Sequence, residues 1–237
     1  MIPRVLLDRA PVPLNSEELR LYQRGSEYSI WIGQTQLMTS QTHGSEERLG
    51  ELACESLATR RKPQLLIGGL GMGFTLAAAL RRLPPGAQVT VAELIPAVVA
   101  WNHGPLAHLA GHPLADPRVT VCEMDVAVLL RTPDRPFDAI IMDVDNGPEG
   151  LTREENDWLY DFSGLGIAYA ALKPGGLLTV WSSHPDQAFT RRLRQVGFAV
   201  EELTVRATGR GKGARHLIWV AKRASQNVVT AKRRNSF

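Results

Sequence analysis

Apolar and polar side chains alternate along much of the first 44 residues. The alternation is clear in Glu18–Arg24 and in Tyr28–Ile32, and short glycine-containing turns join these segments to each other and to Thr35–Thr39. Such alternation is typical of strands that bury one face, and tight turns favour antiparallel pairing. The pattern predicts a small antiparallel β meander over residues 1–44.

One helical pattern follows the meander, and after it apolar strand-like runs alternate with helical segments. Ser45 and two glutamates precede apolar residues at helical spacing up to Leu57, and basic residues with Pro63 end this segment. From Gln64 onward each early strand is followed by a helix, which requires right-handed crossovers and a parallel sheet covered on both faces. The predicted strands are 64–68, 88–93, 118–122, 137–143, 176–182, 198–205 and 215–222, and the predicted helices are 73–82, 96–102, 125–131, 154–172 and 186–196.

The last two predicted strands are joined without a helix, through a glycine-rich turn at 208–213. They therefore form a hairpin, and one of them runs antiparallel to the rest. The fold class is α/β, with a seven-stranded doubly wound sheet over 45–222 behind the meander of 1–44. In open sheets of this kind, ligands bind outside the carboxyl ends of the strands.

The net charge of +3 comes from the end of the chain. Residues 223–237 form a basic segment with little apolar content, which we expect to be flexible, while the remainder is close to neutral. We therefore expect no nucleic-acid partner. No apolar run approaches the ~20 residues that span a bilayer, and a signal peptide is not evident. We expect a cytoplasmic protein without membrane contact, and two cysteines are too few for a disulfide framework.

The glycine-rich stretch Gly68-Gly-Leu-Gly-Met-Gly73 joins the first buried strand to its helix. Gly69, Gly71 and Gly73 allow positive φ and a close backbone approach by a ligand, although such glycines also occur for packing alone. About twenty residues later, Glu93 ends the second strand, where a carboxylate can bind both ribose hydroxyls. The two features together predict a nucleoside-cofactor site, which makes 45–222 a Rossmann-like catalytic domain.

More acids follow at later strand ends. Asp125, after the third strand, is placed to accept from an adenine amino group, to cap the next helix, or to do both. Asp143 ends the fourth strand, and Asp145 and Asn146 lie in the loop behind it. These groups could hold a cationic amine and take its proton, with turn formation as the alternative for the loop residues. We predict catalytic roles for Asp143 and Asp145 and substrate binding for Asn146.

Histidines add one weaker candidate. His184 follows the fifth strand and would face the same rim, so we assign it to substrate binding. The other histidines lack convincing ligand spacing with cysteine or acidic residues, and no metal is predicted.

The order of these motifs resembles that of class I S-adenosylmethionine-dependent methyltransferases, including Leu172-Lys-Pro-Gly-Gly-Leu177 at the approach to the fifth strand. Within this superfamily, the meander, Gln36, the helix bearing Glu51 and Phe137–Asp143 resemble the spermidine/spermine synthases. The resemblance implies that Gln36 contacts the nucleoside, that Glu51 contacts the substrate and that Asp143 orients or deprotonates an amine. It further implies decarboxylated S-adenosylmethionine as donor, a polyamine product and a possible homodimer.

Three departures from that family change the expected chemistry. Gly71 replaces a loop acid that repels the carboxylate of intact S-adenosylmethionine, Leu49-Gly50-Glu51 replaces Tyr-His-Glu, and Asp143-Val-Asp-Asn146 displaces the second acid of Asp-x-x-Asp. The sequence therefore favours an S-adenosylmethionine-utilising transferase that moves methyl to a small, amine-bearing acceptor. Aminopropyl transfer from the decarboxylated donor, a non-catalytic nucleoside-binding relative and an RNA methyltransferase are the alternatives.

Overall fold

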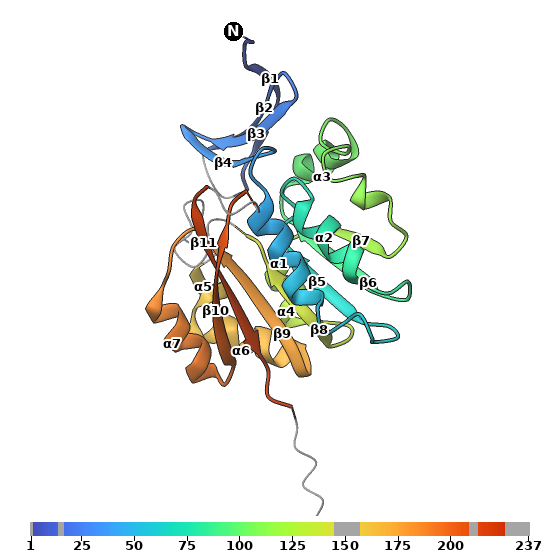
Figure 1. Ribbon diagram of the computed structural model, residues 1–237, viewed down its shortest axis with the longest axis vertical. Coiled ribbons are helices and arrows are strands. Elements are labelled where there is room, and N and C mark those ends of the chain that lie inside the picture. Colours follow the sequence, from blue (N-terminus) through green and yellow to red (C-terminus); the bar gives the residue numbers. More distant parts are fainter. Residues whose placement is uncertain (1, 14–16, 145–156, 209–212, 226–237) are drawn as a thin grey trace, which may run out of the picture.

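The computed structural model describes residues 2–13, 17–144, 157–208 and 213–225, and it contains two β-sheets (Figure 1). The first is an antiparallel sheet in the order β1-β2-β3-β4. Its strands are β1 (Val5–Pro11), β2 (Glu18–Arg24), β3 (Glu27–Ile32) and β4 (Thr35–Thr39). The meander prediction contained the last three of these strands. It missed β1 because most of its side chains are exposed, so that no apolar alternation marks them.

The second sheet has seven strands in the order β10-β11-β9-β8-β5-β6-β7. Strand β11 runs antiparallel to both of its neighbours, and the remaining pairs are parallel. The predicted doubly wound α/β fold with a closing hairpin is therefore confirmed. The strands are β5 (Gln64–Gly68), β6 (Gln88–Glu93), β7 (Val119–Glu123), β8 (Phe137–Met142), β9 (Leu172–Ser182), β10 (Ala199–Arg206) and β11 (Arg215–Lys222).

Helices cover both faces of this sheet, and the N-terminal sheet lies beyond the carboxyl ends of its parallel strands (Figure 1). One face carries α1 (Gly44–Cys54), α2 (Phe74–Arg82) and α3 (Pro96–His103), and the other carries α4 (Val126–Arg131), α5 (Asp157–Tyr160), α6 (Phe162–Ala171) and α7 (Gln187–Val196). The helices α5 and α6 replace the single helix predicted over 154–172. The helix is interrupted at Asp161, whose side chain caps α6 by accepting from the backbone N–H of Gly164.

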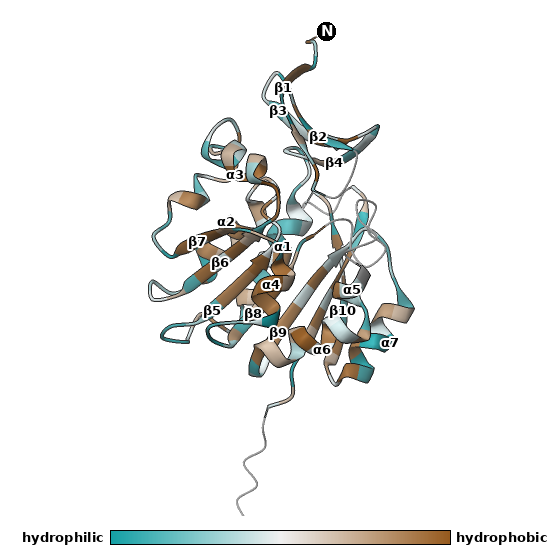
Figure 2. Ribbon diagram, turned by 180° about the vertical axis from the view of Figure 1, so that it is seen from behind, coloured by the Kyte–Doolittle hydropathy of each residue, from teal (hydrophilic) through white to brown (hydrophobic). Residues whose placement is uncertain are grey.

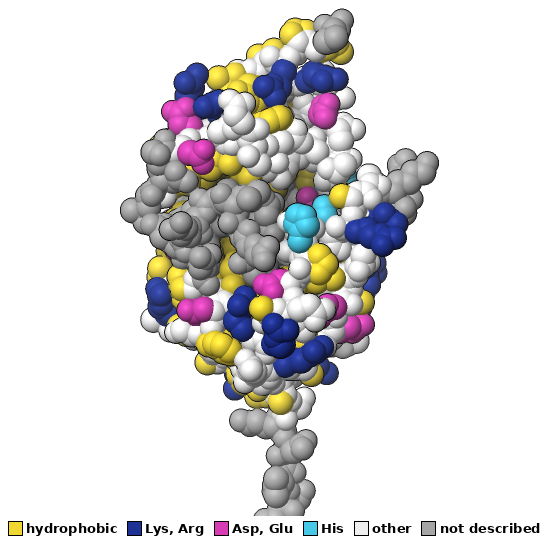
Figure 3. Space-filling model, turned by 90° about the vertical axis from the view of Figure 1, so that its left-hand side faces the viewer, with side chains coloured by type: hydrophobic (Ala, Val, Ile, Leu, Met, Phe, Trp, Pro, Cys, Tyr) yellow, Lys and Arg dark blue, Asp and Glu magenta, His cyan; other side chains and the backbone are white. Residues whose placement is uncertain are grey.

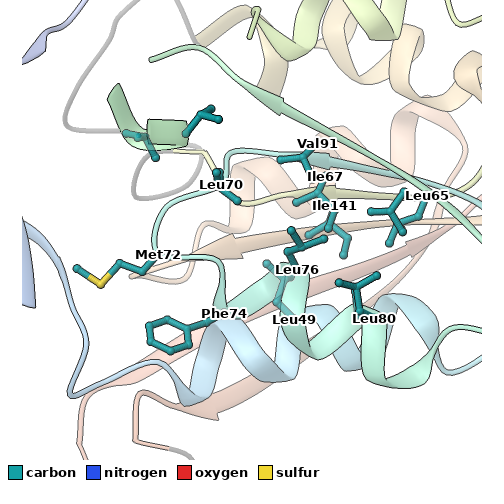
Figure 4. Packing of buried hydrophobic residues seen from close by; sticks show 14 of the residues in the cluster. Leu49, Leu65, Ile67, Leu70, Met72, Phe74, Leu76, Leu80, Val91 and Ile141 are labelled. Atoms are coloured by element: carbon teal, nitrogen blue, oxygen red, sulfur yellow. The ribbon is translucent and has the colours of Figure 1, made fainter. Parts of the chain in front are cut away.

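The apolar strands explain why both faces need cover. Leu65 and Ile67 of β5 pack into the cluster under α1 and α2 (Figure 4). Leu66 between them joins the cluster under α4 and α6. Successive residues of a strand point to opposite faces, so a continuous apolar run is buried twice. Figure 2 shows the resulting hydrophobic bands along β5, β6 and β8.

An ionic cluster fixes the edge of the sheet away from the carboxyl ends. The buried carboxylate of Asp138 accepts from the Arg60 guanidinium, from Lys173 Nζ at 2.6 Å and from the backbone N–H of Gln64 at 2.7 Å. Burial opposes ionisation of Asp138, but these bonds, led by that from Lys173, hold its pKa below the ordinary value. The cluster joins the start of β5 to β8 and β9.

Arg223, at the start of the predicted tail, is held by the body of the protein. Its guanidinium donates to the carbonyl oxygens of Tyr169 and Ala170 at the end of α6, and to that of Leu172. A cation is favourable at a helix C-terminus, where carbonyl groups lack helical partners. From residue 226 onward the tail lies outside the described residues.

Candidate functional site

A cavity of about 470 Å³ lies between the N-terminal sheet and the carboxyl ends of the central strands. Its wall includes Gly69 and Gly71 of the glycine turn, Glu93, Asp125 and Asp143, all of which the sequence placed at strand ends. Apolar residues of β2, β3 and β4 close the opposite side, where Gln36 also lines the cavity. The volume falls in the range of sites for cofactors and small ligands.

The glycine turn requires its glycines for geometric reasons. Gly69 has φ +86°, and a Cβ on it would lie 2.4 Å from the backbone oxygen of Asp143. Gly73 caps α2 in the left-handed conformation at φ +81°. The Asn102 side-chain amide donates to the carbonyl oxygen of Gly71 at 2.8 Å and fixes the turn from behind. The turn thus presents bare backbone to the cavity, as close approach by a ligand requires.

Glu93 is a buried carboxylate oriented by backbone donors. Its Oε2 accepts from the N–H of Leu70 at 2.9 Å, and its Oε1 accepts from the N–H of Ile95 at 2.8 Å. A carboxylate oxygen can accept more than one hydrogen bond, so this orientation is compatible with acceptance from a ligand hydroxyl as well. The position predicted from the spacing to the glycine turn is therefore one where two adjacent hydroxyls can be bound.

Asp125 caps α4 and lines the cavity at the same time. Its Oδ1 accepts from the backbone N–H of Ala127 at 2.8 Å. The capping alternative for Asp125 is thus seen directly, and the second carboxylate oxygen leaves the adenine contact open as a prediction.

Asp143 follows β8 directly and faces the cavity from the strand end. Its backbone N–H donates to the Gly68 oxygen, and its Oδ2 accepts from the Thr75 hydroxyl at 2.6 Å. Burial raises the pKa of Asp143 to about 6, against which the Thr75 hydrogen bond acts. Asp145 and Asn146, predicted to share this loop, lie outside the described residues.

Sequence reasoning missed a second carboxylate beside Asp143. Glu46, in the first turn of α1, lines the cavity and also a smaller pocket next to Gly71 that Asp143 and Thr75 share. Burial, and next the negative charge of Asp143, raise the pKa of Glu46 to about 7. The sequence pattern around Glu46 indicates helix initiation and nothing more. The signal that could have found it is that a helix leading into β5 must begin at the edge where the parallel strands end.

Glu51 lies elsewhere, which corrects its placement in the substrate site. Its carboxylate pairs with Arg48 at 3.3 Å and with Arg82 at 3.1 Å and does not line the described cavity. Burial opposes ionisation, but these arginines, Arg82 first, hold the pKa of Glu51 below its usual range. Five residues along a helix correspond to about 140° around its axis, so Glu46 and Glu51 face different sides.

The other rim of the cavity carries histidine, although not the predicted one. His216 of β11 lines the cavity, and its Nδ1 lies 2.9 Å from the Ser45 hydroxyl. His184 is exposed, pairs with the Ser183 hydroxyl at 2.9 Å and is not among the residues that line the cavity. Burial, with the nearby His184 second, lowers the pKa of His216. Figure 3 shows histidine side chains at the surface below the N-terminal sheet.

Other kinds of site receive no support from the described part of the chain. Within residues 2–13, 17–144, 157–208 and 213–225, no three His, Cys, Asp or Glu side chains are arranged to hold a metal ion. Burial raises the pKa of Cys54 to about 12, so its thiol stays protonated. Across the same ranges, no helix is long and apolar enough to cross a membrane.

Comparisons with known proteins identify the fold. A spermidine synthase in complex with the transition-state analogue AdoDATO has a TM-score of 0.72 at 17% identity, over 92% of this chain and 72% of that one. Spermidine synthase from Thermotoga maritima has a TM-score of 0.73 at 17% sequence identity, and the match covers 92% of this chain and 73% of that one. A probable spermidine synthase from Corynebacterium glutamicum has a TM-score of 0.59 at 16% sequence identity, and the match covers 92% of this chain and 79% of that one. No protein-family model and no curated protein matches the sequence. The chain thus shares a fold with these enzymes.

Proposed function

We propose that this chain, whose fold is that of the spermidine synthases, is a transferase that moves an aminopropyl group from decarboxylated S-adenosylmethionine to the amine of a small acceptor. The observation that carries the proposal is the position of Glu46 and Asp143. These two carboxylates face one cavity beside the glycine turn, while Glu93 faces it from the end of β6. Separate acidic groups are thus available for a nucleoside and for a cationic acceptor.

The residues present fit a nucleoside donor. Gly69 brings the backbone close to the cavity at a point where a Cβ would collide with the chain. Glu93 is oriented by two backbone N–H groups to accept from the ribose hydroxyls, Asp125 lies on the same cavity wall, and Gln36 lines the cavity from the opposite side. When bound, the nucleoside supplies a sulfonium whose sulfur leaves as a neutral thioether. The protein therefore has to orient the acceptor and take one proton.

The proposal reverses the preference for methyl transfer that Gly71 suggested. The same glycine lines a small pocket together with Glu46 and Asp143, so carboxylates are present where the family's loop acid is missing. A Cβ at Gly71 would lie 2.7 Å from Cε of Met38, which shows that the space beside the glycine is filled. Carboxylates beside this turn repel the carboxylate of intact S-adenosylmethionine, as the family's loop acid does, and therefore favour the decarboxylated donor.

The proton balance of aminopropyl transfer requires a base, and it assigns separate roles to Glu46 and Asp143. An ammonium acceptor loses one proton to a carboxylate, the free amine then forms the new C–N bond, and the C–S bond breaks with its electron pair going to sulfur. The product is a secondary ammonium, so one proton leaves per turnover. With a pKa of about 7, Glu46 can accept that proton near neutral pH, and Asp143 holds the nitrogen from the strand end.

Product analysis tests the proposal. Purified protein is incubated with diamines and with either the decarboxylated or the intact donor, and the nucleoside products are separated by chromatography. We expect 5′-methylthioadenosine from the decarboxylated donor. Formation of S-adenosylhomocysteine from the intact donor instead would restore methyl transfer, and binding of either donor without product would indicate a non-catalytic relative.

A pair of variants on one helix sharpens the test. Glu46→Gln should reduce kcat by at least 10²-fold, because general-base catalysis contributes about 10²–10⁴-fold. Glu51→Gln removes a carboxylate from the same helix outside the cavity and should keep kcat within about twofold. Equal loss in both variants would show that α1 is needed only for stability.

A further inference from the structure

Three side chains form a continuous hydrogen-bonded row from the cavity to its histidine rim. Ser45 Oγ lies 2.5 Å from Glu46 Oε2 and 2.9 Å from Nδ1 of His216. Ser45 is completely buried at the start of α1, and His216 belongs to β11. The row therefore joins two elements that are 171 residues apart in the sequence.

The chemistry of the middle group makes the row directional. A hydroxyl has one hydrogen to donate, so Ser45 donates either to Glu46 or to Nδ1 of His216. When it donates to an ionised Glu46, Nδ1 must carry a proton to complete the row. When Glu46 is protonated, Glu46 donates to Ser45 and Ser45 donates to Nδ1. The two arrangements differ by the transfer of one proton along the row.

The two ends of the row have different surroundings. At the inner end, Glu46 faces the cavity together with Asp143, and Glu47 follows it in α1. At the outer end, His216 packs its ring edge-on to Trp181 and is within electrostatic reach of the exposed His184. One end is thus placed at the proposed acceptor and the other near solvent.

We propose that Ser45 and His216 carry to solvent the proton that Glu46 removes from the acceptor amine. This inference rests on the proposed function, because it assigns an exit to the one proton released per turnover. The proton moves from the ammonium to Glu46, and Ser45 passes its own hydrogen to Nδ1 of a His216 ring protonated on Nε2, as it receives the hydrogen of Glu46. The imidazolium then releases its Nε2 proton to water, and the ring returns to the Nε2-protonated tautomer by exchange with solvent before the next turnover. The charges balance, and Glu46 is ionised again.

Release to water draws the proton outward, because the transfer from Glu46 to His216 itself goes from the group with the raised pKa to the group with the lowered pKa. Burial and then His184 lower the pKa of His216, so an imidazolium there gives up its proton readily at neutral pH. Burial and then Asp143 raise the pKa of Glu46, so the carboxylate is a competent base at the inner end. The product is already a secondary ammonium and cannot take this proton back, so Glu46 needs another exit for it.

A structural role for the row must be separated from proton transfer. His216→Asn places an amide near the Nδ1 position, so it can still bond to Ser45 but cannot take up a proton. Ser45→Ala removes the connection with a loss of one oxygen atom. His103, exposed at the end of α3, offers a matched control as His103→Asn.

Turnover is the first measurement. His216→Asn and Ser45→Ala should lower kcat by about 10–100-fold while calorimetry gives an unchanged Kd for the nucleoside, and His103→Asn should match the wild type. Imidazole in the buffer should restore at least a tenth of the lost kcat in His216→Ala, since a free base can fill the space. Wild-type kcat in the two main variants, or no rescue by imidazole, overturns the relay.

A second measurement keeps the relay testable apart from the transferase reaction. Nitrogen NMR of the ligand-free protein follows the ring of His216 as pH is changed, in the wild type and in Glu46→Gln. The relay requires that His216 titrates at a different pH, and with a different tautomer balance, once Glu46 can no longer ionise. Identical titrations overturn the relay, whereas a shift without any transferase product refutes only the proposed function.

Discussion

Replacing Glu46 by glutamine should stabilise the protein at alkaline pH while it damages the site. Glu46 carries a buried carboxyl whose pKa is raised from 4.5 to about 7, first by burial and then by the charge of Asp143. An acid of this kind costs folding free energy whenever it is ionised. Glutamine has nearly the same shape and no charge, so it removes that cost.

The sign and size of the change in unfolding free energy follow from the linkage between the pKa of Glu46 and the stability of the fold. Below about pH 4.5 the carboxyl is protonated in both the folded and the unfolded chain, and no cost arises. Between pH 4.5 and 7 only the unfolded chain releases its proton, so stability falls as pH rises, and above pH 7 the full cost is present. The difference between the two pKa values corresponds to roughly 3 kcal/mol. Because the glutamine keeps part of the burial cost of a polar group, we expect a gain of about 1–3 kcal/mol.

Urea unfolding at about pH 4.5 and about pH 8.5 measures this effect. Glu46→Gln should gain stability over the wild type at the higher pH and show no such gain at the lower pH. Glu51→Gln serves as the control of opposite sign, since its arginine partners lower the pKa of Glu51, and it should lose about 0.5–1 kcal/mol at the higher pH. A loss of stability in Glu46→Gln at the higher pH would mean that a cation already compensates Glu46, and the reasoning on the site would fail.

Three further substitutions probe other parts of the structure. Gly69→Ala puts a Cβ 2.4 Å from the Asp143 backbone oxygen at φ +86°, so calorimetry should detect no nucleoside binding and unfolding should show a loss of about 1–3 kcal/mol. Glu93→Gln sets an amide N–H against a backbone donor such as that of Leu70, and nucleoside Kd should rise at least tenfold at unchanged fold by circular dichroism. Asp138→Ala leaves two cations and a backbone N–H without their buried acceptor, and chemical denaturation should show a loss of about 2–4 kcal/mol.

Local chemistry explains why the centre of the fold could be predicted. The run around Leu66 is apolar at successive positions because both faces of β5 are buried, and the glycines behind it take positive φ. Such signals involve neighbours in the sequence only. Glu93 and Asp143 follow from the same logic, because parallel strands of one sheet deliver their ends to one edge.

Glu46 and His216 were missed because their positions in the site depend on how α1 and β11 pack against the rest of the fold, which the sequence pattern does not contain. Glu46 and Glu51 lie on one amphipathic helix, and only the orientation of α1 against the sheet decides which faces the cavity. The family resemblance assigned Glu51 to the substrate site, whereas Glu46, five residues earlier, is the acid of this helix that lines the cavity. His216 belongs to the last strand, and its approach to Ser45 results from the antiparallel insertion of β11 next to β9.

The carboxylates that line the cavity differ in the hydrogen-bond donors that surround them. Glu93 accepts from two backbone N–H groups, whose dipoles are fixed, so its charge is stabilised where a ligand's hydroxyls would bind. Glu46 and Asp143 accept from the hydroxyls of Ser45 and Thr75, which offset only part of the burial cost. In the proposed reaction, a cationic amine supplies the missing compensation when it binds, and a carboxyl with a raised pKa takes its proton. Carboxylates therefore face the cavity with fixed backbone donors on one side, and with hydroxyl donors and raised pKa values on the other.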